Sequence, residues 1–297
     1  MNSELIHIVI GCTGTGKSDY AIKLAKELNG EIINADVVQM YSGLDIVTNK
    51  INDFQGIEHH LLGFQDPKNI ITVQDFKAKA IEIIKDIIGR NKTPIIVGGT
   101  NYYIESLIWN DYLFTQKLIS SIHIPEEDLY KELEKVDPEM AGKLHPNATR
   151  KIKRSLEIFY TYGQKHSQLI EQQNLQNLVF QNYKIHLIEV ELEKLDPKLN
   201  ARVDKMILSG MQKEICDFFN KYGIRSKGIF QAIGFKEFKE YFNTKKEEDF
   251  LLGIEKMKQA TRQYARRQKK WIRNHLENRI QKTNSQNIIK EVITKKY

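Results

Sequence analysis

The sequence predicts an α/β fold with a parallel sheet core, a helical insertion domain and a long basic C-terminal helical region. Three observations lead to this prediction. Short apolar segments alternate with helix-like segments in the first part of the chain, which is typical of a parallel sheet covered by helices. A long polar segment with helical spacing then interrupts the alternation. The last part of the chain is rich in Lys and Arg and nearly free of helix breakers.

The first expected strand, residues 5–10, leads into GCTGTGKS at residues 11–18, and a helix-like segment follows. In this context the pattern G-x-x-x-x-G-K-[ST] binds phosphate. The loop N–H groups and the helix N-terminus surround phosphate oxygens, Lys17 adds a point charge, and Ser18 can bind Mg²⁺. The core is therefore predicted to be P-loop NTPase-like. The predicted phosphate-binding residues are Thr13, Gly14, Thr15, Gly16, Lys17 and Ser18.

Two further strands, separated by a helix-like segment, are expected at residues 31–35 and 94–97. Asp36 directly follows the first of them, and Thr100 follows the second after two glycines. Because ligands bind beyond the carboxyl ends of parallel strands, both residues are expected beside the phosphate loop. Asp36 can act there as a metal ligand, a general base or only a helix N-cap. The Thr100 hydroxyl can likewise contact a ligand or cap a turn.

The alternation stops near residue 111, and an apolar segment at residues 185–190 is expected to return to the sheet. We therefore divide the chain into a first part of the core (residues 1–111), a helical insertion (112–182) and a third part (183–297). The third part is expected to complete the core and to carry the basic helices. Only helices are expected beyond Pro197, with a loosely ordered tail in the last dozen residues.

The composition excludes several classes of protein. With 41% apolar and 28% charged residues among 297, the chain is expected to be globular with a sizeable core. No apolar stretch approaches the ~20 residues that span a bilayer, and no signal segment is expected. A cytoplasmic location is therefore predicted, with a mitochondrial or nuclear pool left open. Two cysteines, Cys12 and Cys216, do not make a disulfide framework. His59 and His60 lack a third ligand at metal spacing, so packing or a substrate contact is expected instead of zinc binding.

The net charge of +7 is concentrated near the C-terminus, where residues 256–297 hold 13 Lys or Arg against two acids. This distribution indicates either a polyanion partner or a solvated basic helix. Residues 261–271, TRQYARRQKKW, mix cations with Tyr264 and Trp271. That mixture suits contacts with an RNA backbone and stacking on bases, although aromatic residues on a helix are also common in cores.

Together these segments resemble the tRNA dimethylallyltransferases, also called tRNA isopentenyltransferases. The resemblance spans nearly the whole chain, its blocks follow the family order, and the variants TNK and TNYY are similar to eukaryotic members. The blocks are residues 11–18, 32–41 (IINADVVQMY), 45–50 (DIVTNK), 59–61 (HHL), 98–103 (GGTNYY), 145–147 (HPN), 154–157 (RSLE), 202–206 (RVDKM), 232–237 (AIGFKE) and 261–271.

The chain departs from the family pattern at three places. Val37 stands where the family often has Ser, and Ala148 stands where Asp is usual. No cysteine follows Cys216, so the C-terminal zinc finger of many eukaryotic members is not expected here. The resemblance thus places the chain among eukaryotic-like members without the finger, whose grip on tRNA would come from the basic helix.

The resemblance implies transfer of a dimethylallyl group from dimethylallyl diphosphate to the exocyclic amine of the adenosine adjacent to the anticodon in tRNA. Diphosphate is then the leaving group and Mg²⁺ the cofactor. The resemblance further implies that Lys17, the loop amides, Ser18 with Mg²⁺ and Arg202 stabilise the charge that develops as the allylic C–O bond breaks. Asp36 would be the general base, and Thr100 would orient the diphosphate or the base. Catalysis is thus assigned to Asp36, Thr100, Lys17 and Arg202.

The implied partner is the tRNA anticodon stem-loop, whose target base must be flipped out of its stack. Gln39 would contact the adenine, and the insertion and the C-terminal helix would hold the stem-loop from two sides. A monomer without membrane association is expected. The predicted tRNA contacts are Asp36, Gln39, Thr100, Arg150, Lys151, Lys153, Arg154, Arg262, Arg266, Arg267 and Trp271.

Three alternatives stay open at this stage. An adenylate isopentenyltransferase acting on free adenine nucleotide shares the phosphate loop and the allyl donor, but it needs neither the insertion nor the basic segment. A small-molecule P-loop kinase requires only the loop and Asp36, and it leaves residues 261–271 unexplained. A non-catalytic RNA-binding protein leaves Lys17 and Asp36 without a role.

Overall fold

The structure is a computed structural model that describes residues 5–110, 124–172, 177–225, 227–283 and 286–295. The chain forms two compact units, one from residues 1–108 and 178–297 and the other from residues 109–177. The boundary expected between residues 111 and 112 lies outside the described residues. No helix in the described ranges is long and apolar enough to cross a bilayer.

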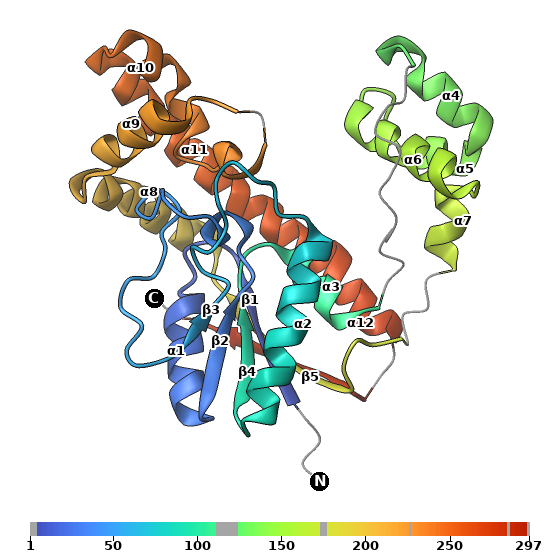
Figure 1. The fold of residues 1–297 in the computed structure, drawn as a ribbon, viewed down its shortest axis with the longest axis horizontal. Coiled ribbons are helices and arrows are strands. Elements are labelled where there is room, and N and C mark those ends of the chain that lie inside the picture. The colour runs from blue at the N-terminus through green and yellow to red at the C-terminus, as the bar shows by residue number, and fades with distance from the viewer. Residues whose placement is uncertain (1–4, 111–123, 173–176, 226, 284–285, 296–297) are drawn as a thin grey trace. The chain divides into compact units, whose positions relative to one another are not determined.

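The larger unit is built on a six-stranded parallel sheet in the order β3-β2-β4-β1-β5-β6 (Figure 1). The inner strand β1 is buried from its second residue to its last, with Ile6, Ile8 and Val9 fully inaccessible. Burial of consecutive residues means that both faces of the sheet are covered, as in other parallel sheets. The strands are β1 Leu5–Gly11, β2 Gly30–Asn34, β3 His59–His60, β4 Thr93–Val97, β5 Asn182–Glu189 and β6 Ile288–Thr294.

The helix α2 of this unit begins at a side-chain cap, where Thr72 and Asp75 form a reciprocal capping box that satisfies two backbone N–H groups. The helices are α1 Lys17–Glu27, α2 Val73–Gly89, α3 Asn101–Ile108, α8 Leu192–Leu208, α9 Met211–Tyr222, α10 Lys239–Thr244, α11 Glu247–Trp271 and α12 Glu277–Thr283. A π-helical turn, Ile272–Leu276, joins α11 to α12.

The C-terminal strand β6 corrects the sequence analysis, which expected helices and then a loose tail beyond Pro197. Residues 288–294 instead pair in parallel with β5 along its length, from Tyr183 opposite Ile288 to Glu189 opposite Thr294. In Figure 1 this strand is the red arrow beside β5. Only Ile288 is buried, while Ile289 and Val292 are largely exposed, so the strand lacks the alternation that reveals a half-buried strand.

The smaller unit is helical, as the sequence predicted for this part of the chain. Its core is formed by Leu129, Leu133, Met140, Ala141, Ile152 and Leu156. Asp137 caps α5 by accepting from the Met140 N–H, and it also accepts from the Ser167 N–H and hydroxyl at 2.9 and 2.6 Å. This buried carboxylate therefore ties α5 to α7. The helices are α4 Leu129–Val136, α5 Pro138–Lys143, α6 Thr149–Tyr162 and α7 His166–Glu171.

Candidate active site

The phosphate loop connects β1 to α1, as the motif predicts. Gly14 and Gly16 have φ angles of 82° and 77°, and Gly16 is the N-cap of α1. A Cβ on Gly14 would lie 2.6 Å from the Leu199 side chain of α8, so this position requires glycine for its backbone angle and for space. The loop is thus packed directly against α8, which also carries Arg202.

Lys17 is folded back over the loop. Its Nζ donates a hydrogen bond to the Cys12 carbonyl at 2.7 Å, and the Thr15 hydroxyl donates to the same oxygen at 2.9 Å. Burial lowers the pKa of Lys17 to about 8, although the nearby Asp36 carboxylate opposes this shift. An incoming anion would therefore stabilise the charged ammonium. Ser18, at the start of α1, is exposed.

Asp36 directly follows β2 and caps the 3₁₀ turn Val37–Met40, since its Oδ1 accepts from the Val38 N–H at 3.3 Å. Its other oxygen, Oδ2, has no hydrogen-bond donor among the described residues. Burial raises the pKa of the Asp36 carboxyl, and the charges of Lys17 and Arg202 and the Val38 N–H oppose that shift. A half-buried carboxylate with one free oxygen and a raised pKa has the properties of a general base.

Thr100 lies beside Asp36 because β2 and β4 end together. Its N–H donates to the Ala35 carbonyl at 3.3 Å, and its hydroxyl oxygen accepts from the Val37 N–H at 3.1 Å. A Cβ on Gly98 would lie 2.3 Å from the Ala35 carbonyl carbon, so the two strand ends approach as closely as backbone allows. The structure gives Thr100 a capping role, and its hydroxyl proton is left for another acceptor.

Arg202 points from α8 into the phosphate loop. Its Nη2 donates to the Thr13 hydroxyl at 2.9 Å, while its buried Nε has no hydrogen-bond partner among the described residues. Burial lowers the pKa of Arg202, and Asp36 opposes this shift. A buried guanidinium N–H without an acceptor is costly, and an anion bound at this site would supply one.

Gln39 lies on the turn after Asp36, and its Nε2 donates to the Thr48 and Asn49 carbonyls at 3.0 and 3.1 Å. The predicted contact with adenine is therefore left to its Oε1. A cavity of about 540 Å³ lies next to this loop and reaches Arg202. Its lining residues are Ser42, Gly43, Asp45, Ile46, Asn49, Lys50, Ile51, Asn52, Phe54, Leu62, Gly63, Arg202, Lys205, Met206 and Ser209.

The predicted tRNA-contacting residues of α11 make contacts within the protein. Arg262 donates to the Asn200 side chain at 2.5 Å, and Arg266 forms a two-pronged ion pair with Asp196 at 2.6 and 3.1 Å. Arg267 lies over the Tyr264 ring, 5.9 Å from its centroid. Trp271 is 37% exposed. Its indole N–H donates at 2.6 Å to Glu105, a buried carboxylate that also binds His275 and Arg279.

The predicted tRNA-contacting residues of the smaller unit, Arg150, Lys151, Lys153 and Arg154, are carried by α6. All four are exposed there. Arg154 lies 3.6 Å from Glu157, one turn along the same helix. The opposite face of α6 packs Ile152 and Leu156 into the core of that unit. The exposed cations therefore line the solvent face of an amphipathic helix, where a polyanion can reach them.

Two residues near the phosphate loop escaped the sequence analysis. Gln268 is buried in α11 and accepts from the Thr13 N–H at 2.8 Å while donating to the Gly99 carbonyl at 2.9 Å. Lys295, which follows β6, donates to the Gly16 carbonyl at 3.3 Å. Gln268 lay inside the block TRQYARRQKKW, but its polar type gave no sign of burial. Lys295 lay in the expected tail.

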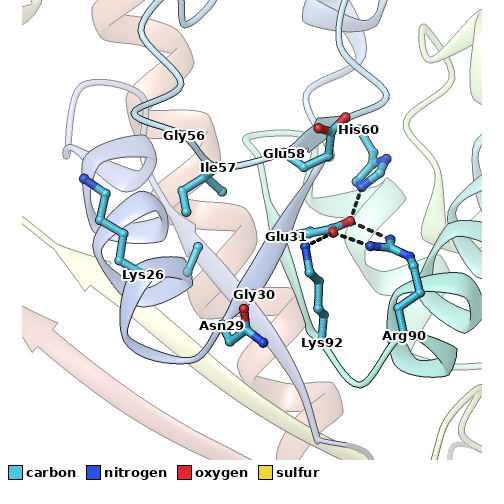
Figure 2. A pocket seen from close by; sticks show the side chains of 11 residues that line it. Lys26, Asn29, Gly30, Glu31, Gly56, Ile57, Glu58, His60, Arg90 and Lys92 are labelled. Carbon is cyan, nitrogen blue, oxygen red and sulfur yellow. Dashed lines mark hydrogen bonds and ion pairs between the residues drawn. The ribbon is translucent and has the colours of Figure 1, made fainter.

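A second polar cluster lies at the start of β2, away from the phosphate loop, and lines a cavity of about 560 Å³ (Figure 2). Its centre is the buried Glu31 carboxylate, which accepts from Arg90 at 2.5 and 2.7 Å, from Lys92 at 2.7 Å and from His60 at 2.8 Å. The Arg90 hydrogen bond, with those of Lys92 and His60, holds the pKa of Glu31 well below its usual range, although burial opposes this shift. His60 is thus a packing residue, and His59 bonds the Ile57 carbonyl.

Known proteins match both this sequence and this fold. The sequence model of the family described as IPP transferase matches residues 39–275, which is most of the chain. The chain belongs to the IPP transferase family. A relative, the tRNA dimethylallyltransferase of Anoxybacillus flavithermus, is 40% identical over 92% of this chain and 88% of its own length.

Two further comparisons show how much of each related protein this chain covers. The tRNA dimethylallyltransferase of Homo sapiens is 41% identical over 90% of this chain, and this chain spans only 65% of that relative's length. Among solved structures, a eukaryotic dimethylallyltransferase acting on tRNA superposes with a TM-score of 0.86 at 34% identity, over 98% of this chain and 74% of the other. The family match begins at residue 39, so it leaves out the phosphate loop and Asp36. Their roles therefore rest on the geometry described above.

Proposed function

We propose that the protein transfers a dimethylallyl group from dimethylallyl diphosphate to the exocyclic amine of the adenosine adjacent to the anticodon in tRNA. Relatives named tRNA dimethylallyltransferase, at 40% and 41% identity, support this proposal. The observation that carries it is the position of Asp36, whose free oxygen lies next to a phosphate loop completed by Lys17 and Arg202. A base beside a diphosphate site suits attack by an amine on an allylic diphosphate.

The loop holds the leaving group in this proposal. The allylic C–O bond breaks and its electron pair leaves with the diphosphate, whose growing charge faces the loop N–H groups, Lys17 and Arg202. The unpartnered Nε of Arg202 and the lowered pKa of Lys17 both indicate groups that gain from an anion. Because these groups are already in place, they stabilise the departing charge without reorganisation, and loss of one such donor typically costs ~10²–10³ in rate.

Asp36 is the general base in this proposal. The adenine amine is a weak nucleophile because its lone pair is delocalised into the ring, so its proton must leave as the new C–N bond forms. The raised pKa of Asp36 makes its carboxylate a stronger base than an exposed one. Thr100 keeps Asp36 in place through the Val37 N–H, and its hydroxyl proton can be donated to the diphosphate or the base.

A divalent cation fits the site only in part. No group of three or more His, Cys, Asp or Glu side chains among the described residues is arranged to hold a metal. The Ser18 hydroxyl is exposed at the loop, so Mg²⁺ would be held by Ser18 and mainly by the substrate. When bound there, Mg²⁺ would neutralise part of the diphosphate charge.

The basic helix α11 is the proposed contact with the tRNA. The ion pair of Arg266 with Asp196 is exposed, and such pairs contribute only ~0–1 kcal/mol, so a phosphate can replace the carboxylate. The partly exposed ring of Trp271 offers a surface for stacking. The cations of α6 would add further contacts with the RNA backbone.

The test is transfer of label from dimethylallyl diphosphate to a synthetic anticodon stem-loop. Parallel reactions contain the same stem-loop with guanosine at the target position, AMP alone, or ATP in place of the allylic donor. We expect label only in the adenosine stem-loop. Label only in AMP would identify an adenylate isopentenyltransferase, and ATP hydrolysis or phosphoryl transfer without prenylation would identify a kinase. If the protein binds the stem-loop but catalyses none of these reactions, it is a non-catalytic RNA-binding protein.

A further inference from the structure

Gln268 joins three parts of the candidate site through one side chain. It belongs to the basic helix α11, its Oε1 accepts from the Thr13 N–H of the phosphate loop, and its Nε2 donates to the Gly99 carbonyl beside Asp36. The side chain is 4% exposed. The orientation of its amide follows from its partners, since an N–H requires the oxygen and a carbonyl requires the nitrogen.

The neighbours of Gln268 leave no room for another arrangement. A Cβ on Gly99 would lie 2.6 Å from Gln268 Nε2 and 3.3 Å from Asp36 Oδ2, so the carboxamide and the carboxylate both lie against the same bare glycine. Tyr264, one turn earlier on α11, donates its hydroxyl to the Gly99 carbonyl at 3.2 Å. Thr13 is fixed from two sides, by Gln268 at its N–H and by Arg202 at its hydroxyl.

The neutrality of the Gln268 carboxamide matters because several charged or polar groups already lie around Asp36 and influence its pKa. The groups that face Asp36 are Lys17 from α1, Arg202 from α8 and the Tyr264 hydroxyl from α11, with Arg267 behind the tyrosine ring. An amide satisfies both loops without adding charge. A carboxylate in its place would repel Asp36, and it could not donate to Gly99 while ionised.

We propose that Gln268 is a positioning residue for the group transfer, because its carboxamide holds the Thr13 amide of the diphosphate loop and the Gly99 carbonyl beside the general base in one fixed geometry. The step that it serves rests on the proposed function, whereas the tether itself rests only on the observed hydrogen bonds. Because Arg266, Arg267, Lys269 and Lys270 flank Gln268 on the exposed side of α11, the same residue links the surface proposed for tRNA to the diphosphate loop.

The test compares Gln268→Met, which keeps the shape but removes both hydrogen bonds, with Gln268→Glu, which adds a charge. Affinity for inorganic diphosphate is measured by calorimetry, and kcat/KM for prenyl transfer to the stem-loop is measured across pH. We expect Gln268→Met to weaken diphosphate binding about five- to tenfold, as the removal of two hydrogen bonds predicts, and to lower kcat without moving the acid limb of the pH profile. We expect Gln268→Glu to move that limb upward by about one pH unit.

Gln259→Met and Gln259→Glu are the matched controls, because Gln259 is exposed on the same helix. They should bind diphosphate and react like the unaltered protein. Diphosphate affinity within twofold of normal in Gln268→Met, or an unmoved acid limb in Gln268→Glu, would overturn the proposal. If Gln268→Met does not fold, the pH profile of Gln268→Glu decides. If the unaltered protein binds diphosphate but modifies no RNA, the proposed function fails and the calorimetry alone tests the tether.

Discussion

Two carboxylates at opposite ends of β2 lie among cations but have opposite properties. Glu31, at the start of the strand, receives hydrogen bonds directly from Arg90, Lys92 and His60, and its pKa is lowered. Asp36 follows the strand, and the cations near it bond elsewhere, Lys17 to Cys12 and Arg202 to Thr13. Its pKa is raised by burial. A carboxylate saturated with donors stabilises a fold, whereas one whose cations are held at a distance stays available for chemistry.

The largest expected difference between these two residues is in activity. Asp36→Asn removes the proposed base but keeps the shape of the side chain, and we expect prenyl transfer to fall by about 10³-fold or more while inorganic diphosphate still binds. Glu31→Gln should leave transfer within a few-fold of normal, since Glu31 is away from the phosphate loop. Steady-state kinetics and calorimetry measure both effects. Near-normal turnover in Asp36→Asn would show that Asp36 is not the general base.

The two substitutions should also change stability in opposite directions at neutral pH. Glu31→Gln leaves Arg90, Lys92 and His60 without their shared carboxylate, and we expect it to lower the free energy of unfolding. Asp36→Asn removes a half-buried charge without a direct cationic partner and with a raised pKa, so it should stabilise the protein. Thermal and urea unfolding test the signs, and two shifts of the same sign would contradict the comparison.

The pH dependence of stability should separate the two carboxylates as well. The folded-state pKa of Glu31 lies below its unfolded value, so its contribution is present above the ordinary carboxyl pKa and is lost as pH falls toward the folded-state pKa. The pKa of Asp36 is raised, so its contribution is present at low pH and is lost as pH rises through the folded-state pKa. In the unaltered protein the free energy of unfolding should therefore fall as the pH is lowered. This fall should be smaller in Glu31→Gln, whereas Asp36→Asn should keep it.

A smaller effect is expected for diphosphate binding at alkaline pH. The pKa of Lys17 is lowered to about 8, so the free loop loses this positive charge as pH rises through that value. Affinity for inorganic diphosphate should fall above about pH 8 in the unaltered protein. Lys17→Arg should bind less well at neutral pH because its shape differs, but its affinity should not show that fall. Calorimetry on both proteins, from neutral pH to well above the Lys17 pKa, gives the comparison.

The smallest effect is expected on the outer face of α11. The double substitution Arg266→Ala with Arg267→Ala should weaken binding of the stem-loop and lower the slope of log affinity against log salt by about 0.7 for each phosphate that the protein no longer neutralises. Lys213→Ala on α9 is the control, because Lys213 also belongs to an exposed ion pair. If the double variant binds the stem-loop with the same affinity and the same salt slope as the unaltered protein, α11 is an ordinary solvated helix and does not contact the RNA.

Local patterns in the sequence were sufficient for much of the fold. Each of β1, β2, β4 and β5 is a short apolar segment, and the polar residues that follow the strands were expected together because parallel strands share an edge. The family and fold class were predicted and are confirmed by the comparisons. The roles assigned to individual site residues stay predictions.

The features that the sequence did not reveal depend on contacts between distant residues. β6 exists because β5 offers a complete ladder of backbone partners, while its own exposed Ile289 and Val292 give no buried face. Gln268 is buried because Gly99, 169 residues away, accepts its hydrogen bond. Likewise, Asp36 keeps an oxygen without a donor because Lys17 and Arg202 donate to Cys12 and Thr13 instead.

The strand order has a consequence for how the chain is made. Residues 109–177 form a unit that is continuous in sequence, so they can fold as soon as they have been synthesised. The complete sheet cannot form so early, because β1 pairs with β5 and β5 pairs with β6, and both β5 and β6 are synthesised after the insertion. A ribosome that stopped before residue 288 would release a chain with β5 as an open edge, a template for aggregation.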